Sequence, residues 1–528
     1  MIWTALLVLA VAPLTGWLLW TRLPGTDPDD PLEAVFAAAL CAVYLVGCSA
    51  LLLAGLGLLR PPLLTASVAL VALALWRAPS RPRAWTRLSP ADAAAALFVA
   101  VLAAAAFAPA SEDLLGGRDG GTYANTAAWL AREGTLEVRS DALASTTGEW
   151  RRIFHASVLF PGFYIVHASS GQLAPQFLHL HPVYMAVGAW LGGPAGLFLV
   201  PPLFGTLSAL AVFFFVRRTL GVAAAVIAAS VLTLNLAQIW SARNPYSEPA
   251  TQAGVFAALW CVAAAHRTGG MRWGVLGGIA LGSCFLLRID APMMLLGLLP
   301  ALVLLAGAAE QPSRWLARAF LPVTLLFAIW GAAHGWLFSR PYVVDLARLV
   351  HPLWAASAAA AIASMIALAF GPRLRGAVGV ILGHGRALWA IASVLICAAF
   401  IFGMWIRPSL EPFAVRPQSG VRTYVEETVV RVGWYFSPVG MLLALAGFVL
   451  LLRRALVRRR VEWLPFLALF FLVAGLYFWN PRIYSDHPWM MRRFLPVVVP
   501  AMGVATAAAV FWLWSIPGRW RPAARTIA

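Results

Sequence analysis

Apolar runs of membrane-spanning length recur from one end of this sequence to the other. A transmembrane helix needs about 20 consecutive apolar residues. The chain is 61% hydrophobic and 11% charged, whereas a soluble domain of this size carries about twice that charged fraction. The sequence therefore predicts an all-α polytopic membrane protein with about 13–15 transmembrane helices. The expected spans lie near residues 2–20, 33–58, 62–76, 90–110, 195–216, 221–239, 250–265, 273–287, 291–308, 319–337, 352–370, 387–405, 436–452, 463–479 and 494–515.

Arginine supplies all of the basic charge and predicts the orientation of the chain. The formal net charge is +18, and each of the 39 basic residues is arginine. Arginine-rich loops join the expected spans on one face, which the positive-inside rule makes cytoplasmic. The long hydrophilic segments 111–181 and 406–435 then lie outside, and the basic tail 516–528 lies in the cytoplasm. The pattern indicates a lipid bilayer as the partner, and not nucleic acid.

The first outer segment contains a helix with an acid directly before it. Residues 122–132 are expected to be helical, with Tyr123 on the apolar face and Gly134 as the stop. Asp119 precedes this helix, whose N-terminus favours an anion and keeps the carboxylate ionised. An ionised carboxylate there can act as a base. The competing interpretation is an ordinary acid in a surface loop.

Two further segments are expected to lie at the membrane surface. The apolar stretch 182–192 is too short to span a bilayer and predicts an interfacial or re-entrant segment. Residues 421–432 place valines on one helical stripe, with Glu426 and Arg431 on the opposite side, a pattern typical of a helix lying flat on a membrane.

Polar groups gather at the outer ends of the expected spans in excess of what topology requires. Ionisable groups at a membrane edge are costly unless they are paired or solvated, so a one-sided cluster predicts a site. Arg288, Arg492 and Arg493 also break the positive-inside trend. They either pair with Asp290 and Asp486 or bind phosphate. The candidate residues at these ends are His181, Arg243, Glu248, Arg288, Asp290, Asp486, His487, Arg492 and Arg493.

The chain resembles the GT-C superfamily of membrane glycosyltransferases, in particular the bacterial group similar to dolichyl-phosphate-mannose-protein mannosyltransferases and ArnT. Four short motifs carry the resemblance in order: residues 118–123, 181–184, 243–248 and 492–496. The resemblance covers about residues 90–515, which predicts a GT-C-like catalytic region there and additional transmembrane helices in residues 1–89. Asp119 lacks an adjacent acidic partner, so the motif does not indicate a divalent metal and does not exclude one.

The resemblance implies a multi-pass enzyme of the plasma (inner) membrane with its active site on the outer, periplasmic side. Such enzymes move a sugar from a polyprenyl-phosphate donor to an acceptor hydroxyl on a protein, a lipid or a cell-wall glycan, usually with inversion. The expected base is Asp119, and the expected phosphate ligands are Arg288, Arg492 and Arg493. The other residues expected to line the site are Arg118, Tyr123, His155, His181, Arg243, Glu248, Asp290, Asp486 and His487.

Three alternatives to this enzyme remain open. A multi-pass transporter or flippase of anionic lipids would also carry many spans, but it would place ionisable or helix-breaking residues near the bilayer midplane. A polymerase or ligase of lipid-linked polysaccharide would carry its long outer loop late in the chain, and here that loop is early. A scaffold subunit with an inactive site is the third.

Overall fold

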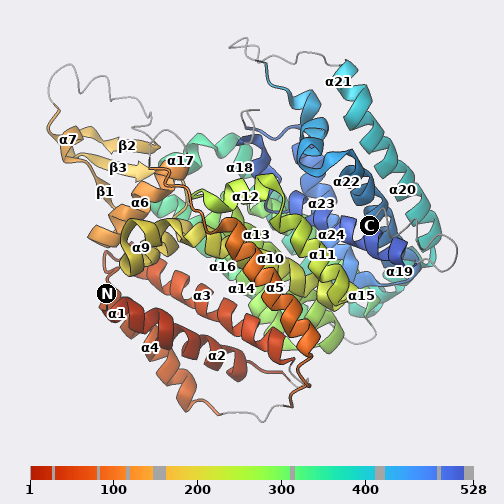
Figure 1. Cartoon of the computed structure of the whole chain (residues 1–528), viewed down its shortest axis with the longest axis horizontal. Helices are drawn as coiled ribbons and strands as arrows, with labels where there is room; N and C mark the ends of the chain where they lie inside the picture. Colours follow the sequence, from red (N-terminus) through yellow and green to blue (C-terminus); the bar gives the residue numbers. More distant parts are fainter. Residues whose placement is uncertain are drawn as a thin grey trace.

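The computed structural model describes residues 2–25, 30–79, 84–114, 119–146, 162–309, 315–410, 422–483 and 489–515, and helices make up most of them (Figure 1). Within these residues, nine helices are long and apolar enough to cross a membrane, or ten if a bent pair counts as one span. Four shorter apolar helices accompany them. The prediction of an all-α polytopic membrane protein is confirmed.

The described α-helices fall into two parts of the chain. The first part of the chain contains α1 (Ile2–Leu6), α2 (Ala12–Arg22), α3 (Pro31–Gly55), α4 (Pro61–Arg77), α5 (Pro90–Phe107), α6 (Asp119–Glu133), α7 (Asp141–Ala144), α9 (Leu180–Phe198), α10 (Val200–Leu220), α11 (Val222–Thr233), α12 (Leu236–Arg243), α13 (Glu248–Thr268) and α14 (Met271–Leu287). The second part contains α15 (Pro292–Ala308), α16 (Leu321–Phe338), α17 (Arg340–Asp345), α18 (Ala347–Ala369), α19 (Gly371–Gly383), α20 (Gly385–Ile401), α21 (Arg407–Leu410), α22 (Thr428–Leu452), α23 (Leu464–Trp479) and α24 (Val498–Trp514).

Helix α13 lies at the centre of the bundle. Every residue from Glu248 to Ala265 is buried, and the helix packs between α10 and α14. Small residues permit this close approach, because helices in lipid associate by backbone packing and not by exclusion of water. A Cβ atom added at Gly254 would lie 2.7 Å from the carbonyl oxygen of Ala280 on α14. The first residue of this central helix is Glu248, so the bundle fixes its position firmly.

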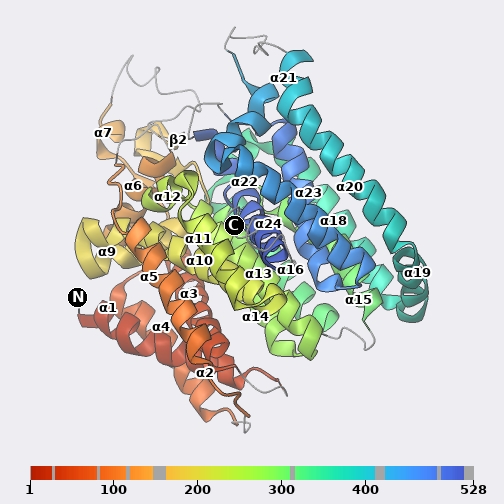
Figure 2. The same ribbon diagram turned by 45° about the vertical axis from the view of Figure 1, so that its right-hand side comes forward.

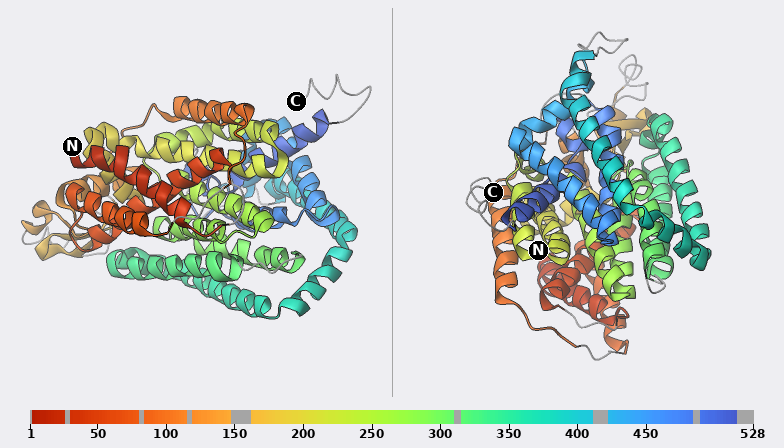
Figure 3. Two further views of the ribbon diagram at one scale, coloured as in Figure 1. Left: turned by 90° about the horizontal axis from the view of Figure 1, so that it is seen from below. Right: turned by 90° about the vertical axis from the view of Figure 1, so that its right-hand side faces the viewer.

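The N-terminal helices pack directly against that centre. The ring of Phe36 on α3 stacks on Phe214 of α10 at 4.6 Å and contacts Trp260 of α13 at 5.4 Å. Figure 2 and Figure 3 show α1–α4 on one flank of the bundle and α19–α20 on another. The outer surface of α20 is apolar, with Ile391 and Val394 59% and 67% exposed, as expected for a face in contact with lipid. The boundary at residue 89 remains a prediction.

Three helices are interrupted. The span near 221–239 is divided into α11 and α12, which meet at a bend of 66°. Asn235 causes this bend, since its side chain accepts hydrogen bonds from the backbone of Ala237 and Gln238 and so starts a new helix. Helix α22 is broken at Ser437, where φ is 59°, immediately before Pro438. Helix α9 has its kink at Gly192 and Gly193.

The first outer segment forms a small layer at one end of the bundle. Helix α6 confirms the predicted helix, with Tyr123, Ala127 and Leu130 buried and Gly134 in the left-handed region directly after it. The three-stranded antiparallel sheet that follows was not expected from the sequence. Its strands β1 (Val138–Arg139), β2 (Phe163–His167) and β3 (Gln172–Pro175) pair in the order β1-β3-β2.

The two predicted surface segments differ in outcome: the interfacial or re-entrant placement of 182–192 stays a prediction, and the flat helix at 421–432 needs correction. The 182–192 stretch belongs to α9, and the part from Leu180 to Gly188 is buried against the core. Residues 425–427 form a 3-10 turn that leads into α22. Glu426 in this turn and Arg431 in α22 are 1% and 7% exposed. A flat surface helix would leave that polar side in water, so the prediction was wrong. Helices also extend to Leu410 and resume at Val425, which leaves less of the predicted 406–435 loop than expected.

Candidate active site

Charged and aromatic residues from distant parts of the chain meet in one cleft at an end of the bundle. The cleft encloses about 50 Å³, which is room for a few water molecules and not for a sugar. It lies between the start of α6, the start of α13, the turn from α14 to α15, and the 3-10 segment η8 (Trp489–Arg493). Its lining residues are Asp119, Tyr123, Phe177, Leu178, Glu248, Leu287, Arg288, Ile289, Asp290, Tyr342, Ile483, Arg492 and Arg493.

Arg492 bridges two carboxylates that are far apart in the sequence. Its Nη1 donates to Oδ2 of Asp119 at 2.6 Å. Its Nε and Nη2 lie 2.9 and 2.7 Å from Oε1 of Glu248. The rings of Tyr246 and Trp489 lie 4.2 and 4.6 Å from its guanidinium carbon. Because the planar guanidinium forks between two acids while it contacts two aromatic faces, this position is specific for arginine.

Arg288 extends the same network toward the turn between α14 and α15. Its Nη1 donates to Oε1 of Glu248 at 2.8 Å, and its Nε and Nη2 each bind an oxygen of Asp290 at 2.9 Å. Oδ2 of Asp290 also accepts from Nη1 of Arg493 at 3.1 Å and from the hydroxyl of Tyr477 at 2.8 Å. The three acids and three arginines therefore form one connected, charge-balanced chain.

Helix ends hold each acid where its charge is favoured. Asp119 and Glu248 occupy the first positions of α6 and α13, and Asp290 lies two residues before α15. The partial positive charge of a helix N-terminus stabilises each carboxylate. Arg288 caps the C-terminal end of α14, which favours a cation. The position of each charged residue at a helix end is therefore set by the local sequence, whereas its ion-pair partner comes from another part of the chain.

Exposure divides the network into an inner part and a rim. The side chains of Glu248, Arg492 and Arg288 are 1%, 4% and 9% exposed. Those of Asp119 and Arg493 are 24% and 27% exposed. A substrate that enters the cleft therefore meets one acid and one arginine first, and the inner residues position them.

Two atoms of the cleft have no hydrogen-bond partner among the described residues. Oε2 of Glu248 is a buried acceptor of this kind, and Nε of Arg493 is a buried donor. Leaving such groups unpaired costs free energy. The acceptor can bind a hydroxyl group and the donor can bind a phosphate oxygen, so the cleft suits a ligand that carries both groups.

The electrostatic environment differs between the floor and the rim of the cleft. Burial alone would raise the pKa of Asp290, but the guanidinium groups of Arg288 and Arg493 and the hydroxyl of Tyr477 hold that pKa well below its ordinary value. At the rim, burial and the nearby charge of Asp119 raise the pKa of Asp113. A Cβ atom added at Gly120 would lie 2.4 Å from Oδ2 of Asp113, so glycine permits this acid to approach α6.

The structure brings most of the predicted site residues together. Asp119, Glu248, Arg288, Asp290, Arg492, Arg493 and Tyr123 all line the cleft. The hydroxyl of Tyr123 lies 3.0 Å from Oγ of Ser247. His181 lies behind the ring of Tyr123, at 5.3 Å, and does not line the cleft. Predicted site residues outside the described part of the chain are Arg118, His155, Asp486 and His487.

Arg243, like His181, is a predicted site residue that does not line the cleft. Its Nε and Nη2 donate to the carbonyl oxygen of Ala106 at 3.0 and 2.8 Å, which ties α12 to the end of α5. Tyr477 belongs to the network through its bond to Asp290 and was not among the predicted residues. Tyr477 ends an apolar span without any polar neighbour nearby, so only its position against Asp290 in space identifies it.

Two buried histidines near the cleft predict an acid-sensitive fold. His179 and His181 are fully buried, and burial lowers the pKa of His181 to about 4 from an ordinary value of 6.5. The unfolded chain therefore binds more protons below pH 6.5, and stability falls as the pH drops from about 6.5 toward 4. Unfolding temperatures in detergent across this range should show a smaller drop for His181→Gln. The exposed His384→Gln is the control, and equal drops in both variants would contradict the prediction.

The three acids of the network are already engaged by arginines. Among the described residues, no group of three His, Cys, Asp or Glu side chains is arranged to hold a metal ion. Asp119, Glu248 and Asp290 are each bound to an arginine.

Helices and cleft together define a multi-pass membrane protein with a polar site at the ends of its helices, and solved structures identify the fold. An Archaeoglobus fulgidus oligosaccharyltransferase matches with a TM-score of 0.51, both in complex with zinc and sulfate and in its apo form. Sequence identity is 14% and 15%, over 82% and 83% of this chain. The chain spans about half the length of that protein, 51–52% of which is matched. The chain has a GT-C-like fold, as the resemblance implied.

A second solved structure is less similar to this chain. ArnT from Cupriavidus metallidurans in its apo state matches 80% of this chain and 79% of its own, at 18% identity and a TM-score of 0.34. No protein-family model matches the sequence, and no curated protein matches it.

Proposed function

We propose that the protein is a membrane glycosyltransferase that moves a sugar from a polyprenyl-phosphate donor to an acceptor hydroxyl. One observation carries this proposal: the charge-balanced cleft presents one acid and one arginine at its rim, with an unpaired acceptor and an unpaired donor beside them. Glycosyl transfer from a phosphate requires a base for the acceptor and a cation for the leaving group. The GT-C-like fold supports the same reaction class.

Asp119 is the base in this mechanism. Its Oδ2 is held by Arg492 at 2.6 Å, which leaves Oδ1 to accept the proton of the acceptor hydroxyl. The acceptor oxygen forms a bond to the anomeric carbon as the bond from that carbon to the phosphate oxygen breaks. The phosphate leaves with the electron pair, and attack from the opposite side inverts the anomeric centre.

Arg493 receives the departing phosphate, and Glu248 orients the sugar. Nε of Arg493 has no hydrogen-bond partner among the described residues, and the group is 27% exposed. Its charge stabilises the negative charge that develops on the leaving oxygen. Oε2 of Glu248 accepts a hydrogen bond from a sugar hydroxyl. Arg288 and Arg492 position these groups from within the network.

Donor entry requires the cleft to open. The enclosed space of about 50 Å³ is smaller than a sugar ring needs. The contact between Arg493 and Asp290 is the longest ion pair of the network, at 3.1 Å, and it lies at the rim. We propose that the donor phosphate replaces Asp290 as the partner of Arg493, while Arg288 and Tyr477 keep the carboxylate of Asp290 satisfied.

An apolar cavity next to the cleft suits the lipid part of the donor. This cavity encloses about 200 Å³ between α14, α16 and α18 and shares Leu178, Arg288 and Ile289 with the cleft. Its wall includes Trp336 and Trp354. A prenyl chain seated there would place its phosphate beside the arginines.

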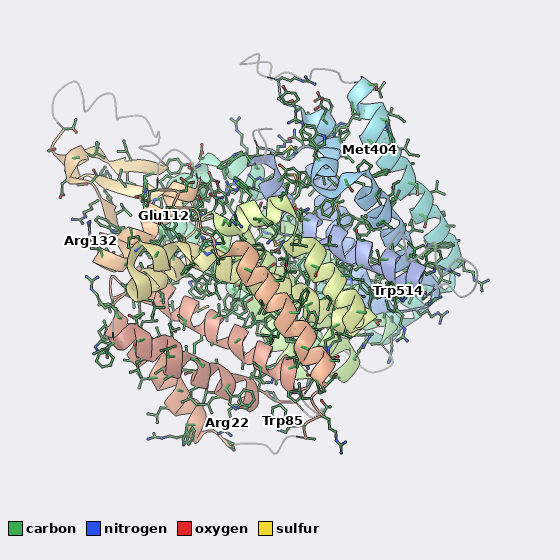
Figure 4. The ribbon with its side chains drawn as sticks, viewed as in Figure 1. Arg22, Trp85, Glu112, Arg132, Met404 and Trp514 are labelled. Atoms are coloured by element: carbon green, nitrogen blue, oxygen red, sulfur yellow. The ribbon has the colours of Figure 1, made fainter. Side chains whose placement is uncertain are left out.

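The orientation of the protein follows from the distribution of arginine. In Figure 4, Glu112 lies on the side of the molecule that carries the sheet, and Arg22 and Trp85 lie at the opposite end. The positive-inside rule supports a cytoplasmic position for the arginine-rich end and for the C-terminus. The cleft and the sheet then face outward, at the plasma membrane. Residues 90–515 form the catalytic region in this proposal, and residues 1–89 are an addition to it.

The transporter alternative has less support. Helix breaks at Ser437 and between α11 and α12 resemble features of transporters. The six charged groups of the network, however, lie at helix ends and not along the interior of a span. This position suits chemistry at a membrane face.

A direct assay tests the proposed function. Purified protein in liposomes is supplied with labelled polyprenyl-phosphate sugars and candidate acceptors from the protein, lipid and cell-wall glycan classes, with and without EDTA. We expect loss of label from the donor and its appearance in one acceptor class. Movement of the intact donor across the bilayer without sugar transfer would instead establish the transporter alternative.

Arg493→Ala is expected to weaken use of the phosphate-linked donor. Removing one charge-assisted contact to phosphate costs about 1.5–3 kcal/mol, which is about a 10- to 150-fold decrease in kcat/KM. Stability should change little, since the side chain is partly exposed and makes one ion pair. Arg132→Ala is the matched control, because this exposed arginine lies over the ring of Trp129 and lines neither the cleft nor the apolar cavity. Equal kcat/KM in Arg493→Ala and wild type would remove Arg493 from the mechanism.

A further inference from the structure

A basic cavity lies at the far end of the helices that build the cleft. It encloses about 340 Å³, a volume comparable with that of small ligand sites. No residue is shared between this cavity and the cleft. Its lining residues are Thr219, Arg267, Arg454, Arg458, Arg460, Glu462 and Trp463.

Helix α13 connects the cleft to the basic cavity, so its length gives the distance between them. Glu248 begins this helix in the cleft, and Arg267, near its last residue, lines the basic cavity. At 1.5 Å per residue, the two positions are about 30 Å apart, which equals the hydrocarbon thickness of a bilayer. Helix α23 runs between the same two ends, from directly after Trp463 to Tyr477 in the site. The basic cavity therefore lies at the opposite membrane face.

The arginines of the cavity outnumber the acids that could neutralise them. Four arginines face one acid, Glu462, which pairs with Arg267 at 3.3 Å. No carboxylate of the described residues forms an ion pair with Arg454, Arg458 or Arg460 within 4.0 Å. Like charges in one cavity repel one another, so an anion that enters it reduces the electrostatic energy of the arginines.

The backbone is folded to bring these arginines together. After the π-helical turn η6 (Arg453–Val457), the amide of Arg460 donates to the carbonyl oxygen of Arg454 at 2.9 Å. This return requires Arg459 to adopt a φ of 53°, a conformation that is unfavourable for residues with a Cβ atom. A glycine would avoid that cost. Topology alone requires arginines near the membrane, but it does not require them to converge on a concave space.

We propose that this cavity binds the phosphate of an anionic lipid headgroup in the leaflet opposite the cleft. Guanidinium groups bind phosphate oxygens with paired, charge-assisted hydrogen bonds. The cavity opens at the ends of membrane-spanning helices, which is the depth at which headgroups lie. The lipid would connect the ends of α13 and α22 and stabilise the bundle from that face. This proposal does not depend on the proposed enzyme activity.

Lipid binding to the purified full-length protein tests the site. Detergent-solubilised protein is titrated with cardiolipin, phosphatidylglycerol and phosphatidylcholine of matched chains, and bound lipid is counted by native mass spectrometry. We expect the two anionic lipids to bind and phosphatidylcholine not to bind at this site. Each arginine contributes about fivefold in affinity, so Arg454→Gln with Arg458→Gln should bind about 25-fold more weakly. Arg453→Gln is the control, because Arg453 lies over the ring of Trp389, outside the cavity.

Three results would overturn the proposal. Equal loss of binding in Arg453→Gln would show that charge near the membrane suffices without the cavity. Inorganic pyrophosphate that binds as tightly as the anionic lipids would assign the site to a soluble anion. Full retention of binding in Arg460→Gln, an exposed position whose replacement does not disturb the core, would also contradict the site and provides a test if the double variant fails to fold.

Discussion

Asp119→Asn is expected to lower the rate of sugar transfer by about 10²- to 10⁴-fold, the usual contribution of a general base. Asparagine has nearly the same shape, and its side-chain oxygen can still accept from Arg492. It cannot take the proton of the acceptor hydroxyl. Since Asp119 is 24% exposed at the rim of the cleft, its replacement should leave the unfolding temperature close to that of the wild type. The measurement is transfer from a labelled polyprenyl-phosphate sugar in proteoliposomes, together with thermal unfolding.

A matched control separates the role of Asp119 as a base from a general loss of negative charge. Asp345 is an exposed carboxylate that accepts a hydrogen bond from Tyr164 at 2.9 Å and does not line the cleft. Asp345→Asn should therefore retain transfer. If Asp119→Asn also retains transfer, Asp119 is not the base and the central assignment of the mechanism is wrong.

Arg492→Ala is expected to have the largest effect on stability. The side chain is 4% exposed and binds both Asp119 and Glu248. Removing one partner of a buried ion pair leaves an uncompensated charge, which costs about 3–5 kcal/mol. Glu248, at 1% exposed, is the group that is left without that partner. Transfer should be lost as well, because Arg492 positions Oδ2 of Asp119. Chemical unfolding in detergent measures the stability difference.

Two companion variants test whether the geometry or the charge of Arg492 is responsible. Arg492→Lys keeps the charge but cannot bridge two carboxylates with a planar fork, so it should recover only part of the stability. Arg493→Ala removes a partly exposed arginine from the same network and should cost about 1 kcal/mol or less. A cost for Arg492→Ala no greater than that for Arg493→Ala would show that the buried bridge does not hold the site together.

Much of the site was predictable because its residues break local rules. Arg288, Arg492 and Arg493 stand against the positive-inside trend, and Asp119 and Glu248 each begin a helix. These signals are local in sequence, and they mark five of the six charged residues of the network. The pairing was harder to predict, since pairing with acids and phosphate binding were equally compatible with the sequence. In the structure all three arginines are paired with acids.

Other features of the structure could not be predicted from short stretches of the sequence. Tyr477 is one aromatic residue among many at the end of an apolar helix, and its bond to Asp290 depends on how α23 packs against α15. The prediction of a flat surface helix failed at Arg431 and Glu426, because a sequence stripe does not show whether protein or water covers the polar side. The small sheet likewise forms between short segments whose pairing partners are separated by up to about 35 residues.

The sequence by itself determined that this chain lies in a membrane, which of its ends is rich in arginine, and which ionisable residues stand out. Lipid is a uniform solvent, so span length and arginine position can be read from the chain directly. The tertiary structure alone decided that Asp119, Glu248 and Asp290 share three arginines in one cleft. Such contacts join residues up to 373 positions apart, and only the packing of α6, α13, α15 and η8 brings them within hydrogen-bonding distance.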